Sequence, residues 1–288
     1  MSAMIQNLKS LNDLVDLAHT LDHATAHEVY YPSGDASRFR VIKNDATNRE
    51  VCTISDRYSI LQHNDALNLI LTGIEAAGIT GGGVLRNYHN NIVVETFFDN
   101  LTIRDHSQDS YIQLGMRFTN SFDKSIGFTG GLTGWRQICS NGMLLGRLLP
   151  NAPHISFNHC GDVVKRITDS MMNFVESVIK MEGSLLTIIN EAREEIITFE
   201  SHDQLIRFTS QFVGSERRAN QIFEIEPVEL STTKWSLYNA LTSYASHTDT
   251  LSYNQYEKIS VGAEKLLGMN NVVLPDMRAP AQTPLITV

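Results

Sequence analysis

The segment Tyr111–Thr119 separates two kinds of side chain, because alternate residues of a strand point to opposite faces. One face is apolar throughout, and the other carries Tyr111, Gln113, Gly115, Arg117 and Thr119. Cations contact phosphates and flat rings stack on bases at roughly 1–3 kcal/mol each, so this second face is suited to single-stranded nucleic acid. Gly115 would let a ligand approach the backbone closely.

Two other segments and one pair of residues extend this pattern. Arg38 and Arg40 share one face of a strand over 38–43, with Phe39 on the core side, and Arg86 and Tyr88 share one face of a strand over 84–88. Trp135 and Arg136 offer a further ring and cation. The alternative is a solvated face with scattered arginines, a buried indole and a structural ion pair, and composition and pattern alone favour it. The binding hypothesis assigns phosphate contacts to Arg38, Arg40, Lys43, Arg57, Arg86, Arg117, Lys124 and Arg136, and base stacking to Tyr88, Tyr111 and Trp135.

Catalytic and cofactor motifs are not recognisable, so we expect no enzyme activity, metal or cofactor. The spacing of His154, His159 and Cys160 matches no standard zinc arrangement. The glycine-rich stretches lack the pattern of a phosphate-binding loop. Glu191, Glu194 and Glu195 have helical spacing but no accompanying histidines, which indicates a solvated helix face.

Charge and composition restrict where a polyanion could bind. The 288 residues carry a formal net charge of -9, which is unusual for a nucleic-acid binder, but 11 basic and 10 acidic residues lie between Arg38 and Arg147. A polyanion site should therefore be a local patch in the first half of the chain. Three dispersed cysteines, the absence of a signal-peptide pattern and the absence of a long apolar run predict reduced thiols and a cytoplasmic, non-membrane protein.

Hydrophobic periodicity predicts an α+β fold with an antiparallel-rich sheet followed by a helical C-terminal region. A helix is expected over 5–20, strands over 38–43, 51–54, 84–88, 92–98, 111–119 and 125–129, and a capped helix over 64–77. Helices are then expected over 163–181, 183–199, 202–213, 232–246 and 254–268. The predicted organisation is a nucleic-acid-binding region (1–160), a helical region (161–270) that packs on the second sheet face or forms an oligomer interface, and an extended tail (271–288).

Four ordered motifs resemble a phage- and plasmid-associated family filed as a domain of unknown function. They are the segments 57–67 (RYSILQHNDAL), 114–125 (LGMRFTNSFDKS) and 136–143 (RQICSNGM), followed by His159. Phe122 replaces the histidine usual in the second motif, which weakens a catalytic or metal role there. Within this family the chain resembles the single-stranded-DNA-binding RNA polymerase cofactors of N4-like phages.

That resemblance implies a noncatalytic protein that binds single-stranded DNA, assists a phage RNA polymerase in transcription inside the infected bacterium, and self-associates into a homo-oligomer. Two alternatives remain. A single-strand annealing protein of recombination would accelerate pairing of complementary strands. An acidic adaptor or inhibitor would instead bind a basic host protein, which suits the overall charge.

Overall fold

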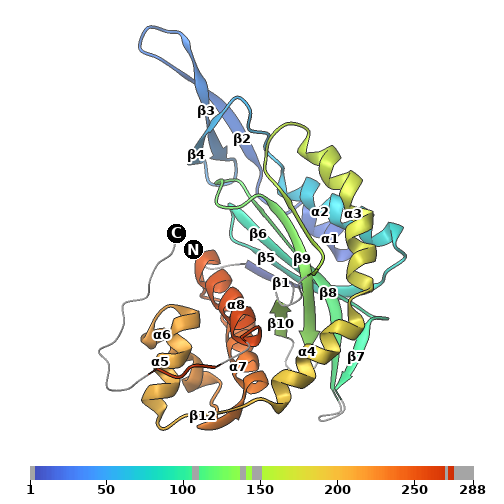
Figure 1. Ribbon diagram of the computed structural model, residues 1–288. Helices are drawn as coiled ribbons and strands as arrows, with labels where there is room; N and C mark the ends of the chain where they lie inside the picture. Colours follow the sequence, from blue (N-terminus) through green and yellow to red (C-terminus); the bar gives the residue numbers. More distant parts are fainter. Residues whose placement is uncertain (1–3, 106–109, 137–140, 145–150, 270–271, 276–288) are drawn as a thin grey trace.

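A computed structural model describes residues 4–105, 110–136, 141–144, 151–269 and 272–275 and is built around an antiparallel sheet of eight strands (Figure 1). The main path of the sheet is β1-β5-β6-β8-β9-β10, with β7 pairing with β8 and β11 with β9. The strands are β1 (Met4–Leu8), β5 (Gly81–Asn87), β6 (Asn91–Phe98), β7 (Thr102–Asp105), β8 (Ser110–Ser121), β9 (Phe128–Arg136), β10 (Asn141–Leu144) and β11 (His154–Phe157).

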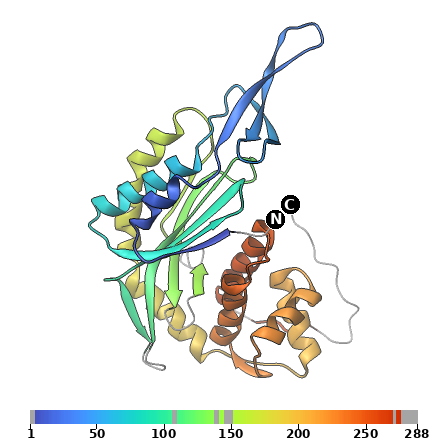
Figure 2. The same cartoon turned by 180° about the vertical axis from the view of Figure 1, so that it is seen from behind.

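Three helices cover one face of this sheet: α1 (Asp13–Ala18), α2 (His63–Ala76) and α3 (Val163–Ile179) (Figures 1 and 2). The apolar side chains of β8 face them, and the rings of Phe118 and Phe174 lie 5.8 Å apart. Met171 of α3 packs closely against Gly73 of α2. This face therefore holds the core that the alternation in β8 predicts.

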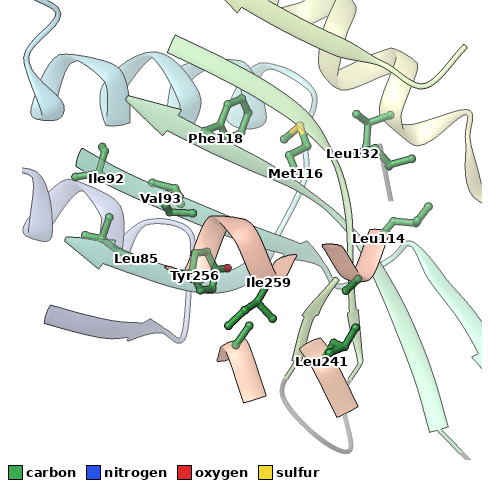
Figure 3. Packing of buried hydrophobic residues seen from close by; sticks show 14 of the residues in the cluster. Leu85, Ile92, Val93, Leu114, Met116, Phe118, Leu132, Leu241, Tyr256 and Ile259 are labelled. Carbon is green, nitrogen blue, oxygen red and sulfur yellow. The ribbon is translucent and has the colours of Figure 1, made fainter. Parts of the chain in front are cut away.

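The opposite face of the sheet is covered as well, by α7 (Lys234–His247) and α8 (Tyr253–Leu267) (Figure 3). Leu241, Tyr256 and Ile259 are buried here, and the ring of Tyr256 lies against the side chains of Arg86 and Arg117, which point to this face. Packing on the second sheet face is one of the two roles that the sequence suggested for the C-terminal helices. The intervening elements are α4 (Glu182–Glu194), β12 (Ile196–Thr198), α5 (His202–Val213), α6 (Glu216–Ile225) and β13 (Ser231–Thr233).

A separate three-stranded sheet projects from one end of the molecule (Figure 1). It consists of β2 (Ala24–Tyr30), β3 (Ala36–Asn44) and β4 (Arg49–Ser55), and we call it the arm. Its base has a small core of its own, in which Ala24, Ile42 and Ile54 pack against Phe122 from the connection between β8 and β9. Phe122 thus joins the arm to the main sheet.

The α+β class and the order of strands before helices are confirmed, but several local predictions are wrong. Residues 4–8 form β1, not the start of a helix over 5–20, because their backbone pairs with β5. The predicted cap of α2 is also wrong: the helix begins at His63, and Gln62 at the N-cap makes no side-chain capping bond. The elements β2, β7, β10, β13 and α6 were not predicted from the sequence, and β12 falls in a segment predicted as the end of a helix over 183–199. Most of the predicted tail lies outside the described residues, although the carbonyl of Pro275 accepts a hydrogen bond from Gln204.

No helix in the described part of the chain is both long and apolar enough to cross a membrane.

Candidate nucleic-acid interface

Four of the predicted contact residues lie between the main sheet and the C-terminal helices. Arg86 is 2% exposed and Arg117 is 6% exposed, and Tyr88 and Trp135 are also buried. The expectation that they form an open sheet face is wrong, because α7 and α8 cover that face. Trp135 packs on the ring of Phe97, and Tyr88 lies edge-on to Tyr253 of α8.

The two buried arginines are held in one charge cluster with α8. Nε of Arg86 and Nε of Arg117 each lie 3.7 Å from the Glu95 carboxylate, and Arg117 also forms an ion pair with Glu257. The Tyr256 ring lies under both guanidinium groups, at 4.7 Å from Arg86 and 5.3 Å from Arg117. Burial alone would lower the pKa of Arg117, but Glu257, Tyr256 and Glu95 raise it, so the guanidinium stays charged. Their charges are compensated internally, and their burial leaves phosphate no access to them.

Gly115 was predicted to let a ligand approach the backbone, but it instead allows close packing of the neighbouring strand. A Cβ at this position would lie 1.7 Å from the carbonyl oxygen of Thr96, so the neighbouring strand occupies the space. Tyr111 is 39% exposed, but it lies at the start of β8, far from the arm, whose base adjoins the other end of this strand at Ser121. At a rise of ~3.3 Å per residue the two ends of β8 are about 33 Å apart. The side chain of Arg136 lies outside the described residues.

The other five predicted cations gather on the arm and at its base. Arg38, Arg57 and Lys124 are exposed, and Arg40 and Lys43 are half-buried. Nη2 of Arg40 donates to the carbonyls of Asp56 and Tyr58 at 3.5 and 3.2 Å, and Nζ of Lys124 donates to the carbonyl of Thr53 at 2.5 Å. In the described part of the chain none of the five forms an ion pair with a carboxylate.

The arm also exposes aromatic rings. Phe39 is 39% exposed, and the guanidinium of Arg38 lies 5.0 Å from its ring centroid. Tyr30 and Tyr31, at the turn between β2 and β3, are 60% and 52% exposed. The assignment of Phe39 to the core side is therefore wrong, because the outer part of the arm has no element packed over either face (Figure 1). Exposed rings beside cations are the combination that the sequence analysis expected on the main sheet.

A pocket of about 270 Å³ lies at the base of the arm. Three connections meet there: Arg57 and Tyr58 follow β4, Lys124 joins β8 to β9, and Asn158 and His159 follow β11. The hydrogen bond from Lys124 to Thr53 and a bridge between Tyr58 and Cys160 tie these connections together. Residues far apart in the sequence thus line one hollow, which includes the two cations Arg57 and Lys124.

Tyr58 and His159 form a hydrogen-bonded pair in the wall of this pocket. The Tyr58 hydroxyl lies 2.7 Å from Nδ1 of His159. Burial lowers the pKa of His159 to about 4, so the imidazole is neutral near pH 7. Burial also raises the pKa of Tyr58, with smaller electrostatic contributions from Cys52 and Asp123, so the phenol keeps its proton.

Beneath the pocket, a second histidine organises the same connections. Nε2 of His63 donates to the carbonyl of His89 at 3.2 Å, and Nδ1 accepts from Asn120 at 3.0 Å. The ring stacks on Phe122 with 3.8 Å between centroids. Burial lowers the pKa of His63 to about 3, so this residue is a neutral structural element.

Two of the pocket residues, Arg57 and Lys124, were predicted from the sequence as phosphate contacts, whereas no role was predicted for Tyr58 or His159. Both residues occur in the motifs that carry the family resemblance, and this was the available signal. The aromatic residues of the arm were missed because β2 was not recognised. The alternation over Ala24–Tyr30 before a Pro-Ser-Gly turn would have predicted this hairpin.

The fold and the pocket define an antiparallel α+β protein with a cationic hollow at one end of its sheet. A family model described as Domain of unknown function (DUF932) matches residues 51–267, and the chain therefore belongs to this family. All residues that line the pocket fall within the matched range, whereas β2 and β3 of the arm precede it. No curated protein and no solved structure matches the chain.

Proposed function

We propose that this chain binds single-stranded DNA along the arm and into the pocket at its base, without catalysing a reaction on it. The observation that carries the proposal is the exposed pair of Arg38 and Phe39, on the arm that ends beside Arg57 and Lys124. The choice of DNA follows the resemblance to phage transcription cofactors. The path differs from the one expected from sequence, since the main sheet face is closed.

Unpaired cations provide the electrostatic part of the binding. Arg38, Lys43, Arg57 and Lys124 form no ion pair in the described part of the chain, so phosphates need not displace a carboxylate from them. Arg40 has a different role, because its guanidinium bonds to backbone carbonyls and fixes the arm to the pocket. Four cations correspond to about four neutralised phosphates.

Aromatic stacking provides the selectivity of binding for single strands over duplexes. In a duplex the base faces are already stacked on each other, whereas in a single strand they are free to stack on a protein ring. Phe39, Tyr30 and Tyr31 are exposed on a projecting element, where a flexible strand has access from several sides (Figure 2). The strongly acidic C-terminal part, with 9 basic and 15 acidic residues over 171–288, would repel the strand and confine it to the arm.

The same resemblance supports a role beside a phage RNA polymerase, in a homo-oligomer. In that role the arm holds the single-stranded template, and the acidic C-terminal helices remain available to a protein partner. A DNA-bound complex that retains the polymerase supports this part of the proposal. Retention of a basic host protein by a chain that binds no DNA favours the adaptor alternative instead.

Fluorescence anisotropy with a labelled oligothymidine tests the binding. Phe39→Ala should weaken binding by about 5- to 150-fold, which corresponds to one lost stacking contact. Arg217→Ala is the matched control, because Arg217 is an exposed cation on α6, far from the arm, and its loss should leave the affinity unchanged. Equal affinities of wild type and Phe39→Ala would contradict an arm-based site.

A further inference from the structure

The pocket at the base of the arm has the size of a site for one small group. Its volume of about 270 Å³ falls just below the ~300–1,000 Å³ range of typical small-molecule pockets. Three connections border this hollow, and its small volume has room for one group, not for a run of several nucleotides. The geometry therefore suits the end of a strand or a single nucleotide.

The pair of Tyr58 and His159 leaves one proton donor unused. If the phenol donates to Nδ1, the proton of the imidazole is on Nε2, which is buried and has no partner among the described residues. If Nδ1 donates to the phenol oxygen, the phenol proton has no acceptor in the described part of the chain. Either tautomer leaves an N–H or O–H without an acceptor, and a buried unsatisfied donor is costly. Since Nε2 is inaccessible, the group that a ligand can reach is the hydroxyl of the half-buried Tyr58, whose oxygen then accepts from Nδ1 of His159.

Two cations complete the arrangement. Lys124 has a backbone φ of +62°, in the left-handed region that a lysine seldom adopts. The turn is held by Ser121, whose hydroxyl donates to the carbonyl of Ile126, and by Asp123, which accepts from the amide of Ser125. Arg57 is exposed and makes no ion pair with a described residue. Asp123 lies close enough to raise the pKa of Tyr58, so the site is not purely positive.

We propose that this pocket binds a phosphomonoester, either the terminal phosphate of a nucleic-acid strand or the phosphate of a free mononucleotide. Arg57 and Lys124 balance its two negative charges, and the Tyr58 hydroxyl, which accepts from Nδ1 of His159, donates to a phosphate oxygen. The strand end as the source of this phosphate rests on the proposed function, but the phosphate chemistry of the pocket does not.

Anisotropy competition with the full chain tests this site. The probes are a short labelled oligothymidine with a 5′-phosphate, the same strand with a 3′-phosphate, the same strand with both ends as hydroxyls, thymidine 5′-monophosphate and inorganic phosphate. A terminal phosphate at one end should strengthen binding by at least about tenfold, since hydrogen bonds to a charged group are stronger than neutral ones. Thymidine monophosphate should remove this gain by competition.

Variants test whether the gain in affinity from a terminal phosphate arises in the pocket. Lys124→Asn removes the charge but keeps a residue that tolerates positive φ, and Tyr58→Phe removes only the hydroxyl. Each should reduce the preference for a terminal phosphate, whereas Arg38→Ala on the arm should weaken all strands equally and leave the preference intact. Circular dichroism of each variant checks that the fold is retained.

The outcomes separate this inference from the proposed function. Strands that bind equally well with and without a terminal phosphate overturn the phosphomonoester site, while the strand-binding function stands. Binding of thymidine monophosphate or phosphate, lost in Lys124→Asn, without binding of any strand supports the site and overturns the strand-binding function. Failure of every probe to bind overturns both.

Discussion

The Tyr256 hydroxyl donates a 2.5 Å hydrogen bond to Oε1 of Glu95, joining α8 to the middle of β6. Glu95 is 1% exposed and is the acid shared by the two buried arginines of the main sheet. This contact explains why strands that carry arginines do not form an open binding face. The cations of the sheet stabilise the attachment of the C-terminal helices, whereas those of the arm form no ion pair with a described carboxylate.

Removal of Glu95 should therefore destabilise the whole fold. Glu95→Ala leaves Arg86 buried without an acidic partner, and loss of one partner of a buried pair costs about 3–5 kcal/mol. Glu216→Ala is the control, because Glu216 and Arg207 form a partly exposed pair at 3.8 Å that contributes at most about 1 kcal/mol. Urea denaturation measures both. Similar losses in the two variants would show that the buried cluster is not a structural centre.

Gly115 and Gly131, on neighbouring strands, should respond differently to a methyl group. Gly115→Ala places a Cβ against the carbonyl of Thr96, and overpacking of this kind costs about 1–3 kcal/mol. A Cβ on Gly131 meets nothing within 4 Å, so Gly131→Ala should change the stability little. The free energies of unfolding from denaturant titration provide the comparison. An unchanged stability of Gly115→Ala would contradict the close strand packing.

Acid should weaken the fold through two neutral histidines. The folded-state pKa is about 3 for His63 and about 4 for His159, below the ordinary 6.5, so the unfolded chain binds more protons between these values. Stability is then complete above about pH 6.5 and falls as the pH decreases, by up to about 4 kcal/mol from both residues between pH 7 and pH 5.

The histidine contribution is separable from that of the carboxylates. His159→Gln removes one of the two titrating groups. The loss of stability that histidine protonation causes between pH 7 and pH 5 should therefore be about half as large in this variant as in the wild type. Denaturant titrations at several pH values give both curves. Parallel curves for wild type and variant would mean that His159 does not titrate with folding.

Much of the sheet could be predicted from the sequence, because alternation marks β8 and a run that is apolar on both faces marks β6 as a central strand. The region around β1 could not, since Ile5 and Leu8 fit a helical spacing and only their pairing with β5 decides otherwise. A local sequence pattern cannot show that a segment pairs with a strand more than 70 residues away. The helices from α3 onward were recognised by their apolar stripes, except α6.

The site was predictable in its residue types but not in its location. Arg38 and Arg117 look alike in sequence, each alternating with apolar neighbours in a strand. They differ because a carboxylate from another element pairs with Arg117 and none pairs with Arg38 among the described residues. The partner of Arg117, Glu257, lies 140 residues away in the sequence, so local pattern cannot reveal it. The roles of Tyr58 and His159 likewise depend on a contact across 101 residues.

The salt dependence of binding to a labelled oligothymidine tests the central claim most directly. Four free cations, Arg38, Lys43, Arg57 and Lys124, predict a slope of log affinity against log salt of about -2.8, at about -0.7 per phosphate. The double variant Arg57→Ala with Lys124→Asn should reduce the slope to about -1.4. A wild-type affinity that is undetectable, or that does not change with salt, would contradict the assignment of the arm and its pocket as a single-stranded DNA site.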